Sequence, residues 1–288
     1  MRGGRPRTTA SVLILALLAL VLLVAACSGT GQTTAGTSPS TVPATGGGST
    51  LPSASTAPTT ATSSSTAPAS GPAGTASTTT TLAGGIQPEY QVVQALSDVH
   101  PVASPGGKAV KTFAQINVLG QLTSLLVTGP AVDKGGRTWY PVRLAMRPNG
   151  STGWVSSDEV VPTTETAAIV VNLSAHSLTL YNQGAEVATY PVGLGSKADP
   201  TPTGAFFVIG VLQPADPNGA YGAYAIGTSA FSDTLPNWPG GGVVGIHGTN
   251  EPGSIGKNVS HGCIRLNNKD ITALAQAVTL GTPIFIRP

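Results

Sequence analysis

The chain has 288 residues and a formal charge of only +2, a length that allows one or two folded domains if all of it folds. Between Arg7 and Glu89 there is no charged residue, and no aromatic residue precedes Tyr90, so this part cannot bury enough apolar surface to fold. Lysine and arginine are scattered singly and form no basic stripe, which argues against nucleic acid as a partner.

The amino terminus has the features of an export signal. Three arginines within the first seven residues precede an apolar run from Val12 to Val24, which is short for a membrane span. The run ends in LVAACS at residues 23–28, which resembles a bacterial lipobox. The resemblance predicts a lipoprotein signal peptide over residues 1–26 and a lipid on Cys27, which would anchor the protein at the outer face of the bacterial cytoplasmic membrane, in the cell wall. An ordinary signal peptide and an uncleaved membrane anchor are the alternatives.

Residues 27–85 consist largely of Ser, Thr, Pro, Ala and Gly. This composition is typical of a disordered tether. A flexible chain of this length would hold a folded domain about 40 Å from its anchor. Such a spacing suits a protein that is tied to a membrane and must reach into the cell wall.

Residues 86–162 contain short apolar runs between turn residues. We predict strands at 91–93, 124–127 and 139–142, separated by Gly- and Pro-rich turns such as Arg147-Pro148-Asn149-Gly150. The placement of turns and aromatic residues resembles the bacterial SH3-type barrels that accompany cell-wall enzymes. This resemblance predicts a small SH3-like β-domain. A role as a simple spacer and a role in wall binding remain equally open.

From residue 167 onward the apolar pattern stays typical of strands. We predict strands at 168–173, 177–181, 186–192, 204–211, 243–247 and 284–286, the first two joined by a hairpin turn at residues 174–176. Only residues 270–279 predict a helix, because apolar residues recur there at helical spacing. Asn268 or Asp270 would cap this helix. The expected fold class is therefore mainly β with one short helix.

Cys263 lies in the stretch VSHGCIRL, and it has no partner if Cys27 carries a lipid. A lone cysteine is usually a small buried hydrophobe. Here the loop between His247 and Ser260 is rich in glycine, so it can bring His247 and His261 back toward one thiol. A thiol with an ordinary pKa of about 8.5 needs such an imidazole to attack a carbonyl at neutral pH.

The spaced pattern Ile246-His247-Gly248-Thr249 and Ser260-His261-Gly262-Cys263-Ile264-Arg265-Leu266 resembles the signature of L,D-transpeptidase catalytic domains of the YkuD type. Upstream, residues 201–206 (TPTGAF) resemble a strand entry of that family, and residues 223–229 resemble the segment that leads to its active-site lid. The resemblance covers about 167–288 and implies a β-sandwich catalytic domain with one short helix.

The resemblance also implies the roles of the residues at the centre of the motif. Cys263 would be the nucleophile and His247 the general base, with the backbone carbonyl of Gly248 orienting the imidazole ring. His261 would lie beside the thiol and support the site. The amides of Gly262 and Cys263 would form the oxyanion hole.

Four further residues are candidate substrate contacts: Arg265, Ser260, Thr249 and Tyr224. For Arg265, a contact with a substrate carboxylate and a structural ion pair are equally open. The remaining histidines, His100 and His176, lie in the β-unit and in a hairpin turn, and we expect neither to be functional.

The implied activity is that of a cysteine acyltransferase acting on peptidoglycan stem peptides, without a cofactor or metal. Cys263 would attack the L,D bond of a tetrapeptide stem, release D-Ala and pass the acyl group to the amine of a neighbouring stem, giving a 3→3 cross-link. Transfer to water would make the enzyme an L,D-carboxypeptidase.

Two other functions compete with this one. A zinc peptidase could use His247, His261 and Cys263 as ligands, although the chain has no HExxH motif. A wall-binding lipoprotein with a degenerate catalytic domain is the non-enzymatic alternative, although every residue of the motif is present.

Overall fold

The computed structural model describes residues 86–237 and 240–288. The predicted signal peptide, the predicted lipid site Cys27 and the predicted tether lie outside these residues. Among the described helices, none has the length and apolar character needed to cross a membrane.

The first six strands form two small antiparallel sheets, which we call the β1–β6 unit. One sheet has the order β2-β1-β6 and the other β3-β4-β5. The strands predicted at 91–93, 124–127 and 139–142 are confirmed, and the SH3-like character of this unit stays a prediction. The strands are β1 (Tyr90–Ala95), β2 (Ser124–Leu126), β3 (Val132–Lys134), β4 (Arg137–Arg143), β5 (Thr152–Ser156) and β6 (Val160–Glu165).

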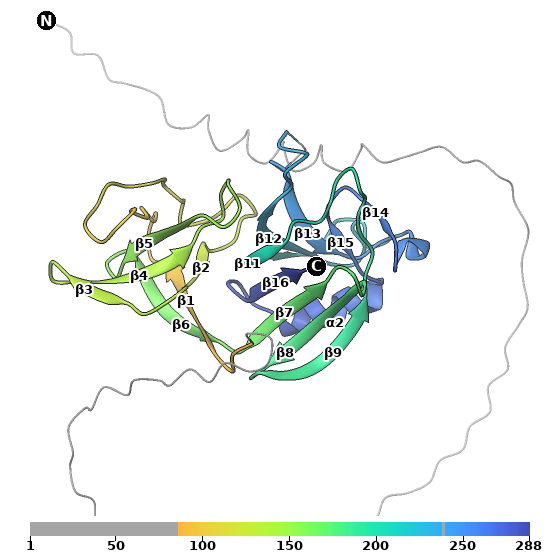
Figure 1. Cartoon of the computed structure of the whole chain (residues 1–288), viewed down its shortest axis with the longest axis horizontal. Helices are drawn as coiled ribbons and strands as arrows, with labels where there is room; N and C mark the ends of the chain where they lie inside the picture. Colours follow the sequence, from red (N-terminus) through yellow and green to blue (C-terminus); the bar gives the residue numbers. More distant parts are fainter. Residues whose placement is uncertain (1–85, 238–239) are drawn as a thin grey trace, which may run out of the picture. The chain divides into compact units, whose positions relative to one another are not determined.

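The rest of the chain is built on one eight-stranded sheet of order β15-β13-β12-β11-β16-β7-β8-β9. Figure 1 shows β11, β12, β13 and β15 side by side in this sheet. Its strands are β7 (Ala167–Asn172), β8 (Ser177–Asn182), β9 (Ala185–Pro191), β11 (Gly204–Leu212), β12 (Ala225–Phe231), β13 (Val243–His247), β15 (Ile264–Arg265) and β16 (Pro283–Arg287). The short strands β10 (Leu194–Gly195) and β14 (Asn258–Ser260) pair in parallel, and a 3₁₀ turn, η2, covers Pro252–Ser254.

The two faces of the sheet are buried in different cores, because successive side chains of a strand point to opposite faces. On β11, Phe206 and Val208 belong to the core that the sheet shares with the helix. The alternate residues Phe207 and Ile209 belong to the core of the β1–β6 unit. All the described residues accordingly fall within a single compact unit.

The helix α2 spans Asn268–Ala277, two residues earlier than predicted, and it buries Ile271 and Leu274. The predicted cap is wrong: Asn267 is the N-cap, and it makes no side-chain capping bond. Asn268 and Asp270 both lie inside the helix, and Asn268 Oδ1 accepts a hydrogen bond from the Thr249 amide at 3.1 Å. The mainly β class with one short helix is confirmed.

The sequence did not predict β12 as a strand. Most of residues 223–229, whose resemblance to a segment leading to a lid stays a prediction, belong to β12, which lies between β11 and β13 in the large sheet. The strand is irregular, with a register shift against each neighbour. Its glycine and small residues weaken the β-propensity signal that would reveal it.

Candidate active site

Strand pairing brings the predicted base and nucleophile together. His247 is the last residue of β13, and Cys263 directly precedes β15. The two strands pair in parallel, with Ile246 opposite Ile264 and His247 opposite Arg265. Residues that are far apart in the sequence therefore lie on neighbouring strands of one sheet edge.

Gly245 marks the point where the two side chains approach each other. Its amide donates a hydrogen bond to Cys263 Sγ at 3.4 Å. A Cβ atom added at Gly245 would lie 3.8 Å from His247 Cδ2 and 4.0 Å from Cys263 Sγ. The thiol and the imidazole edge thus flank the same small space, which the missing side chain leaves open. Gly245 lies two positions before His247 on one strand, so the two residues share a face of that strand.

The imidazole of His247 is buried and has one defined tautomer. Its Nδ1 lies 2.6 Å from the Gly248 carbonyl, as the family resemblance implied. A carbonyl can only accept, so Nδ1 carries the proton and Nε2 remains a proton acceptor. Burial lowers the His247 pKa to about 4, with the nearby Arg265 charge adding to the effect and the Gly248 bond opposing it. The ring is therefore neutral at neutral pH.

The thiol of Cys263 is likewise neutral in this environment. Burial raises its pKa, and the Gly245 hydrogen bond and the Arg265 charge only partly offset this. Cys263 forms no disulfide within residues 86–237 and 240–288. The resting pair is consequently a protonated thiol beside a neutral imidazole, so attack on a carbonyl requires the proton to move as the sulfur approaches.

Two buried hydroxyls brace the loop that carries Cys263. Ser260 Oγ donates to the Cys263 carbonyl at 2.6 Å and accepts from the Gly262 amide at 3.2 Å. Thr201 Oγ1 donates to the Gly262 carbonyl at 2.9 Å and accepts from the Gly195 amide at 2.9 Å. Gly262 itself has a φ of +105°, which only glycine adopts readily. Thr201, in the TPTG stretch, is a residue whose role the sequence did not reveal.

These hydrogen bonds leave fewer backbone donors for an oxyanion hole than the family resemblance implied. The Gly262 amide already donates to Ser260 Oγ and is not directed at a free site. The Cys263 amide makes no hydrogen bond to another residue within the described ranges. Of the two donors that the resemblance implied, only the Cys263 amide is available in this conformation.

The expected substrate contacts of Ser260 and Thr249 are not supported by the geometry. Ser260 is 2 % exposed and Thr249 is 5 % exposed. Thr249 Oγ1 accepts a hydrogen bond from the Glu251 amide at 3.0 Å, so this hydroxyl stabilises the turn that follows His247. Tyr224 is half-buried against the core, and its hydroxyl accepts from Gln213 Nε2 at 2.6 Å. All three hold the local structure.

Arg265 forms an ion pair, the structural one of the two expected alternatives. Its Nη1 lies 2.7 Å from Glu251 Oε2. The arginine side chain is 19 % exposed and that of Glu251 is 67 % exposed, so solvent screens the pair and its contribution to stability is small, about 0–1 kcal/mol. The pair ties the loop that follows His247 to the strand that follows Cys263.

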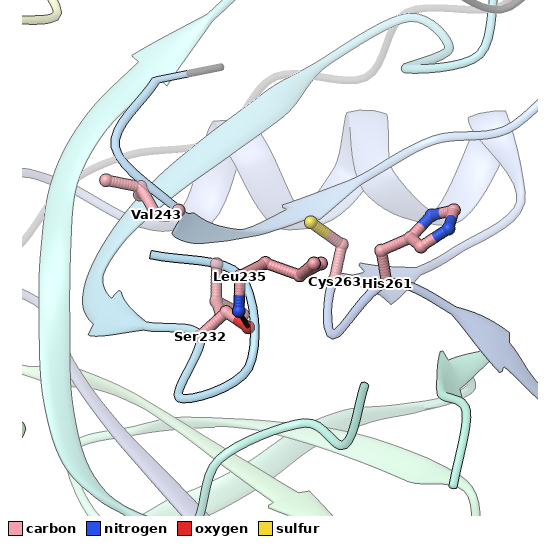
Figure 2. Close-up of a pocket in the computed structure, with 7 residues that line it drawn as sticks. Ser232, Leu235, Val243, His261 and Cys263 are labelled. Atoms are coloured by element: carbon pink, nitrogen blue, oxygen red, sulfur yellow. Dashed lines mark hydrogen bonds between the residues drawn. The ribbon is translucent and has the colours of Figure 1, made fainter. Parts of the chain in front are cut away.

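The thiol opens onto a narrow pocket of about 30 Å³ (Figure 2). In Figure 2 the thiol of Cys263 and the ring of His261 extend in opposite directions from their loop. His261 is exposed and lines the same pocket. The lining residues are Ser232, Leu235, Gly242, Val243, Val244, His261 and Cys263.

Tyr221 is a further residue at the site that the sequence did not single out. Its ring lies against His247, with the ring centroids 4.9 Å apart and the planes tilted by 59°. The tyrosine is partly exposed, so it covers one side of the buried imidazole at the protein surface. The two remaining histidines lie elsewhere: His100 Nδ1 is 2.9 Å from Glu159 Oε1, and His176 Nε2 is 2.9 Å from Asn258 Oδ1.

No group of three or more His, Cys, Asp or Glu side chains in residues 86–237 and 240–288 is arranged to hold a metal ion. The two histidines and the cysteine of the alternative zinc site do not form such a group. His247 also uses its Nδ1 in the bond to Gly248.

Comparison with known proteins identifies the family. Residues 166–286 match the model of the YkuD family, described as an L,D-transpeptidase catalytic domain. A protein of Bacillus licheniformis named putative L,D-transpeptidase YkuD is 36 % identical over 159 residues, which cover 53 % of this chain and 88 % of that protein. The Bacillus subtilis protein of the same name is 41 % identical over 118 residues, which cover 41 % of this chain and 64 % of that protein.

Among solved structures, an L,D-transpeptidase from Mycobacterium smegmatis aligns with a TM-score of 0.35 and 18 % identity, covering 57 % of this chain and 90 % of that one. The family assignment rests on the sequence relatives and on the matched catalytic-domain model. The chain therefore belongs to the YkuD family of L,D-transpeptidase catalytic domains and is an enzyme of that class.

Proposed function

We propose that this enzyme forms 3→3 cross-links between peptidoglycan stem peptides, with Cys263 as the nucleophile and His247 as the base. The observation that carries the proposal is the arrangement around Gly245. There the Cys263 thiol and the edge of a neutral His247 ring flank one open space on the same sheet edge.

The first half of the reaction forms an acyl-enzyme. His247 Nε2 takes the thiol proton while Cys263 Sγ bonds to the carbonyl carbon on the L side of the L,D bond. The Cys263 amide stabilises the oxyanion that results. The carbon–nitrogen bond then breaks, the imidazolium returns its proton to the departing amine, and D-Ala leaves.

The second half transfers the acyl group. The amine of a neighbouring stem attacks the thioester, and His247 takes the proton that this amine loses. The thiolate departs and regains the proton from the imidazolium, which restores the neutral pair. Water in place of the amine would complete an L,D-carboxypeptidase reaction, as a side activity of the same site.

Because the resting pair is neutral, His247 is required in both halves of the reaction. A thiolate that existed beforehand could attack without a base, whereas a thiol whose pKa is raised needs a base to take its proton. Tyr221 covers the imidazole, and Ser260 and Thr201 hold the nucleophile loop, so these three are positioning residues.

Product analysis tests the proposed reaction. The full chain should convert a disaccharide tetrapeptide into 3→3 linked dimers with release of one D-Ala per bond, whereas Cys263→Ala should form none. The proposal fails if the alanine variant forms dimers at the wild-type rate, or if chelation with EDTA abolishes activity and zinc restores it.

We further propose that the protein is exported and anchored at the outer face of the cytoplasmic membrane by a lipid on Cys27, within reach of the cell wall. The LVAACS stretch and the preceding apolar run support this location. The wild-type protein should fractionate with membranes and Cys27→Ala should not. Equal membrane association of the two proteins contradicts the lipid anchor.

A further inference from the structure

The turn between β4 and β5 of the β1–β6 unit reaches across to the wall of the catalytic pocket. Arg147 in this turn donates two hydrogen bonds, from Nη1 to the Gly241 carbonyl at 2.9 Å and from Nη2 to the Ser232 carbonyl at 2.8 Å. Its guanidinium carbon also lies 4.7 Å from the centre of the Phe231 ring. One planar side chain thus bridges two points on the chain that follows β12.

Asn149, in the same turn, binds the end of β12. Its Oδ1 accepts from the Phe231 amide at 2.9 Å, and its Nδ2 donates to the Phe231 carbonyl at 2.7 Å. The side-chain amide therefore satisfies both backbone groups of one residue, as a neighbouring strand would. Arg147 and Asn149 together bind the chain where it leaves β12, at Phe231 and Ser232, and where it comes back toward β13, at Gly241.

The chain that follows β12, residues 232–237 and 240–243, supplies one wall of the pocket beside Cys263, and we call it the pocket wall. Ser232 and Leu235 on its first half, and Gly242 and Val243 on its return, line the pocket. The Ser232 amide donates to the Gly242 carbonyl at 2.8 Å, which joins the two halves. This wall is therefore fixed at its base, next to the thiol.

Gly242 shows how closely Arg147 fits this wall. It has a φ of +72°, and a Cβ atom there would meet the Leu235 carbonyl oxygen first and lie 2.8 Å from Arg147 Nη2. Any other residue would therefore collide with the Leu235 backbone and crowd the guanidinium that binds the Ser232 carbonyl. The glycine directly precedes β13 and the arginine belongs to the β1–β6 unit, so the two parts of the chain fit together here.

We propose that Arg147 and Asn149 are positioning residues of the β1–β6 unit that fix the pocket wall against which the stem peptide binds. The inference rests on the proposed function for its substrate. The thiol and imidazole are held separately, by β13, β15 and the Gly245 amide. Loss of Arg147 or Asn149 therefore weakens substrate binding and leaves the chemistry of the thiol unchanged.

Three variants of the full chain and one control test this inference. Arg147→Ala removes two hydrogen bonds. Asn149→Ala removes the two to Phe231 and a longer one, of 3.5 Å, to Asp233 Oδ1. Arg147→Lys keeps the charge but cannot bridge two carbonyls. Arg137→Ala is the matched control, because Arg137 is an exposed arginine on β4 of the same unit and pairs with Asp158. A tetrapeptide stem is the substrate, and iodoacetamide is the probe of the thiol.

We expect KM for the tetrapeptide to rise about tenfold in Arg147→Ala and Asn149→Ala, and less in Arg147→Lys, with little change in kcat. The rate of alkylation by iodoacetamide and its pH profile should match the wild type. Hydrogen exchange of the amides in 231–237 and 240–243 should accelerate. Arg137→Ala should match the wild type in all of these measurements.

The inference is overturned if KM and the exchange rates of these amides stay at wild-type values in both alanine variants. It is also overturned if exchange accelerates throughout the large sheet and alkylation of Cys263 accelerates in parallel, because general destabilisation exposes the thiol. A wild-type protein that does not turn over the tetrapeptide refutes the proposed function instead. In that case the exchange rates alone decide whether Arg147 and Asn149 hold the wall.

Discussion

At the level of single residues, the active site depends on the open space beside Gly245 as well as on the Cys263 thiol and the His247 imidazole. The motif around Cys263 and His247 is recognisable in the sequence, whereas the place of Gly245 beside the sulfur depends on the pairing of β13 with β15. Its amide contacts the sulfur, and its missing side chain leaves room in which, on the proposed mechanism, a substrate carbonyl meets both groups.

Gly245→Ala tests this role. The added methyl group would make ordinary van der Waals contacts with His247 Cδ2 and Cys263 Sγ, so the fold should tolerate it. It would nevertheless occupy the space needed by the reacting carbonyl, and we expect kcat/KM to fall about 100-fold with little change in Tm. The matched control is Gly253→Ala, because Gly253 has no other group within 4 Å of an added Cβ. Equal kcat/KM in the two variants would contradict this role.

The lowered pKa of His247 predicts how stability depends on pH. The imidazole titrates at about 4 in the folded protein and at about 6.5 when unfolded, so the unfolded state binds more protons between these values. The free energy of unfolding should decrease as the pH falls from about 6.5 to about 4, by up to about 3 kcal/mol from this group. Urea unfolding across this range should show a smaller decrease in His247→Gln. An identical pH dependence in both proteins would place the pKa of His247 near its ordinary value.

At the scale of the elements, the nucleophile loop is held from β10 and from the chain before β11. Thr201→Val keeps the shape of a buried side chain but removes the bonds to the Gly262 carbonyl and the Gly195 amide. We expect a loss of about 1–3 kcal/mol in the free energy of unfolding and a lower kcat, because the loop that positions Cys263 loses a brace. Thr203→Val, at an exposed position of the same TPTG stretch, should change neither quantity. Similar effects of the two substitutions would contradict a specific role of the Thr201 hydroxyl in holding the loop.

The sequence predicted most elements because their apolar pattern is local. The strands around residues 168–181 and the helix near 271–278 alternate at the periods of their secondary structure. The irregular strand β12 was missed because its small residues carry little of this signal. The contacts of Ser260 and Thr249, and the ion-pair partner of Arg265, could not be predicted, since each depends on which loops tertiary folding brings together.

At the level of the whole molecule, the β1–β6 unit and the large sheet share a core. They are also connected by the turn that carries Arg147 and binds the pocket wall. Phe207 and Ile209 of β11 pack among residues of the β1–β6 unit. Glu165, at the end of β6, accepts hydrogen bonds from Thr279 and Thr282 beyond the helix. An SH3-like domain acting as a separate spacer would need none of these contacts.

The shared core predicts a single cooperative unfolding transition for the described residues. Phe207→Ala should lower the free energy of unfolding by about 3–5 kcal/mol and shift the whole transition, because it opens a cavity between the two parts. Calorimetry should give one peak in both proteins, and Val187→Ala, at an exposed position, should leave the peak in place. Two separate peaks, only one of them moved by Phe207→Ala, would contradict a shared core.

The central claim, that Cys263 carries the acyl group with His247 as its base, is tested most directly by mass spectrometry. The full chain is mixed with a tetrapeptide stem, quenched during turnover, digested and mapped. The account predicts a tripeptide acyl group on the peptide that contains Cys263, absent in Cys263→Ala and formed far more slowly in His247→Ala. Turnover without any adduct on Cys263, together with full activity in Cys263→Ala, would contradict it.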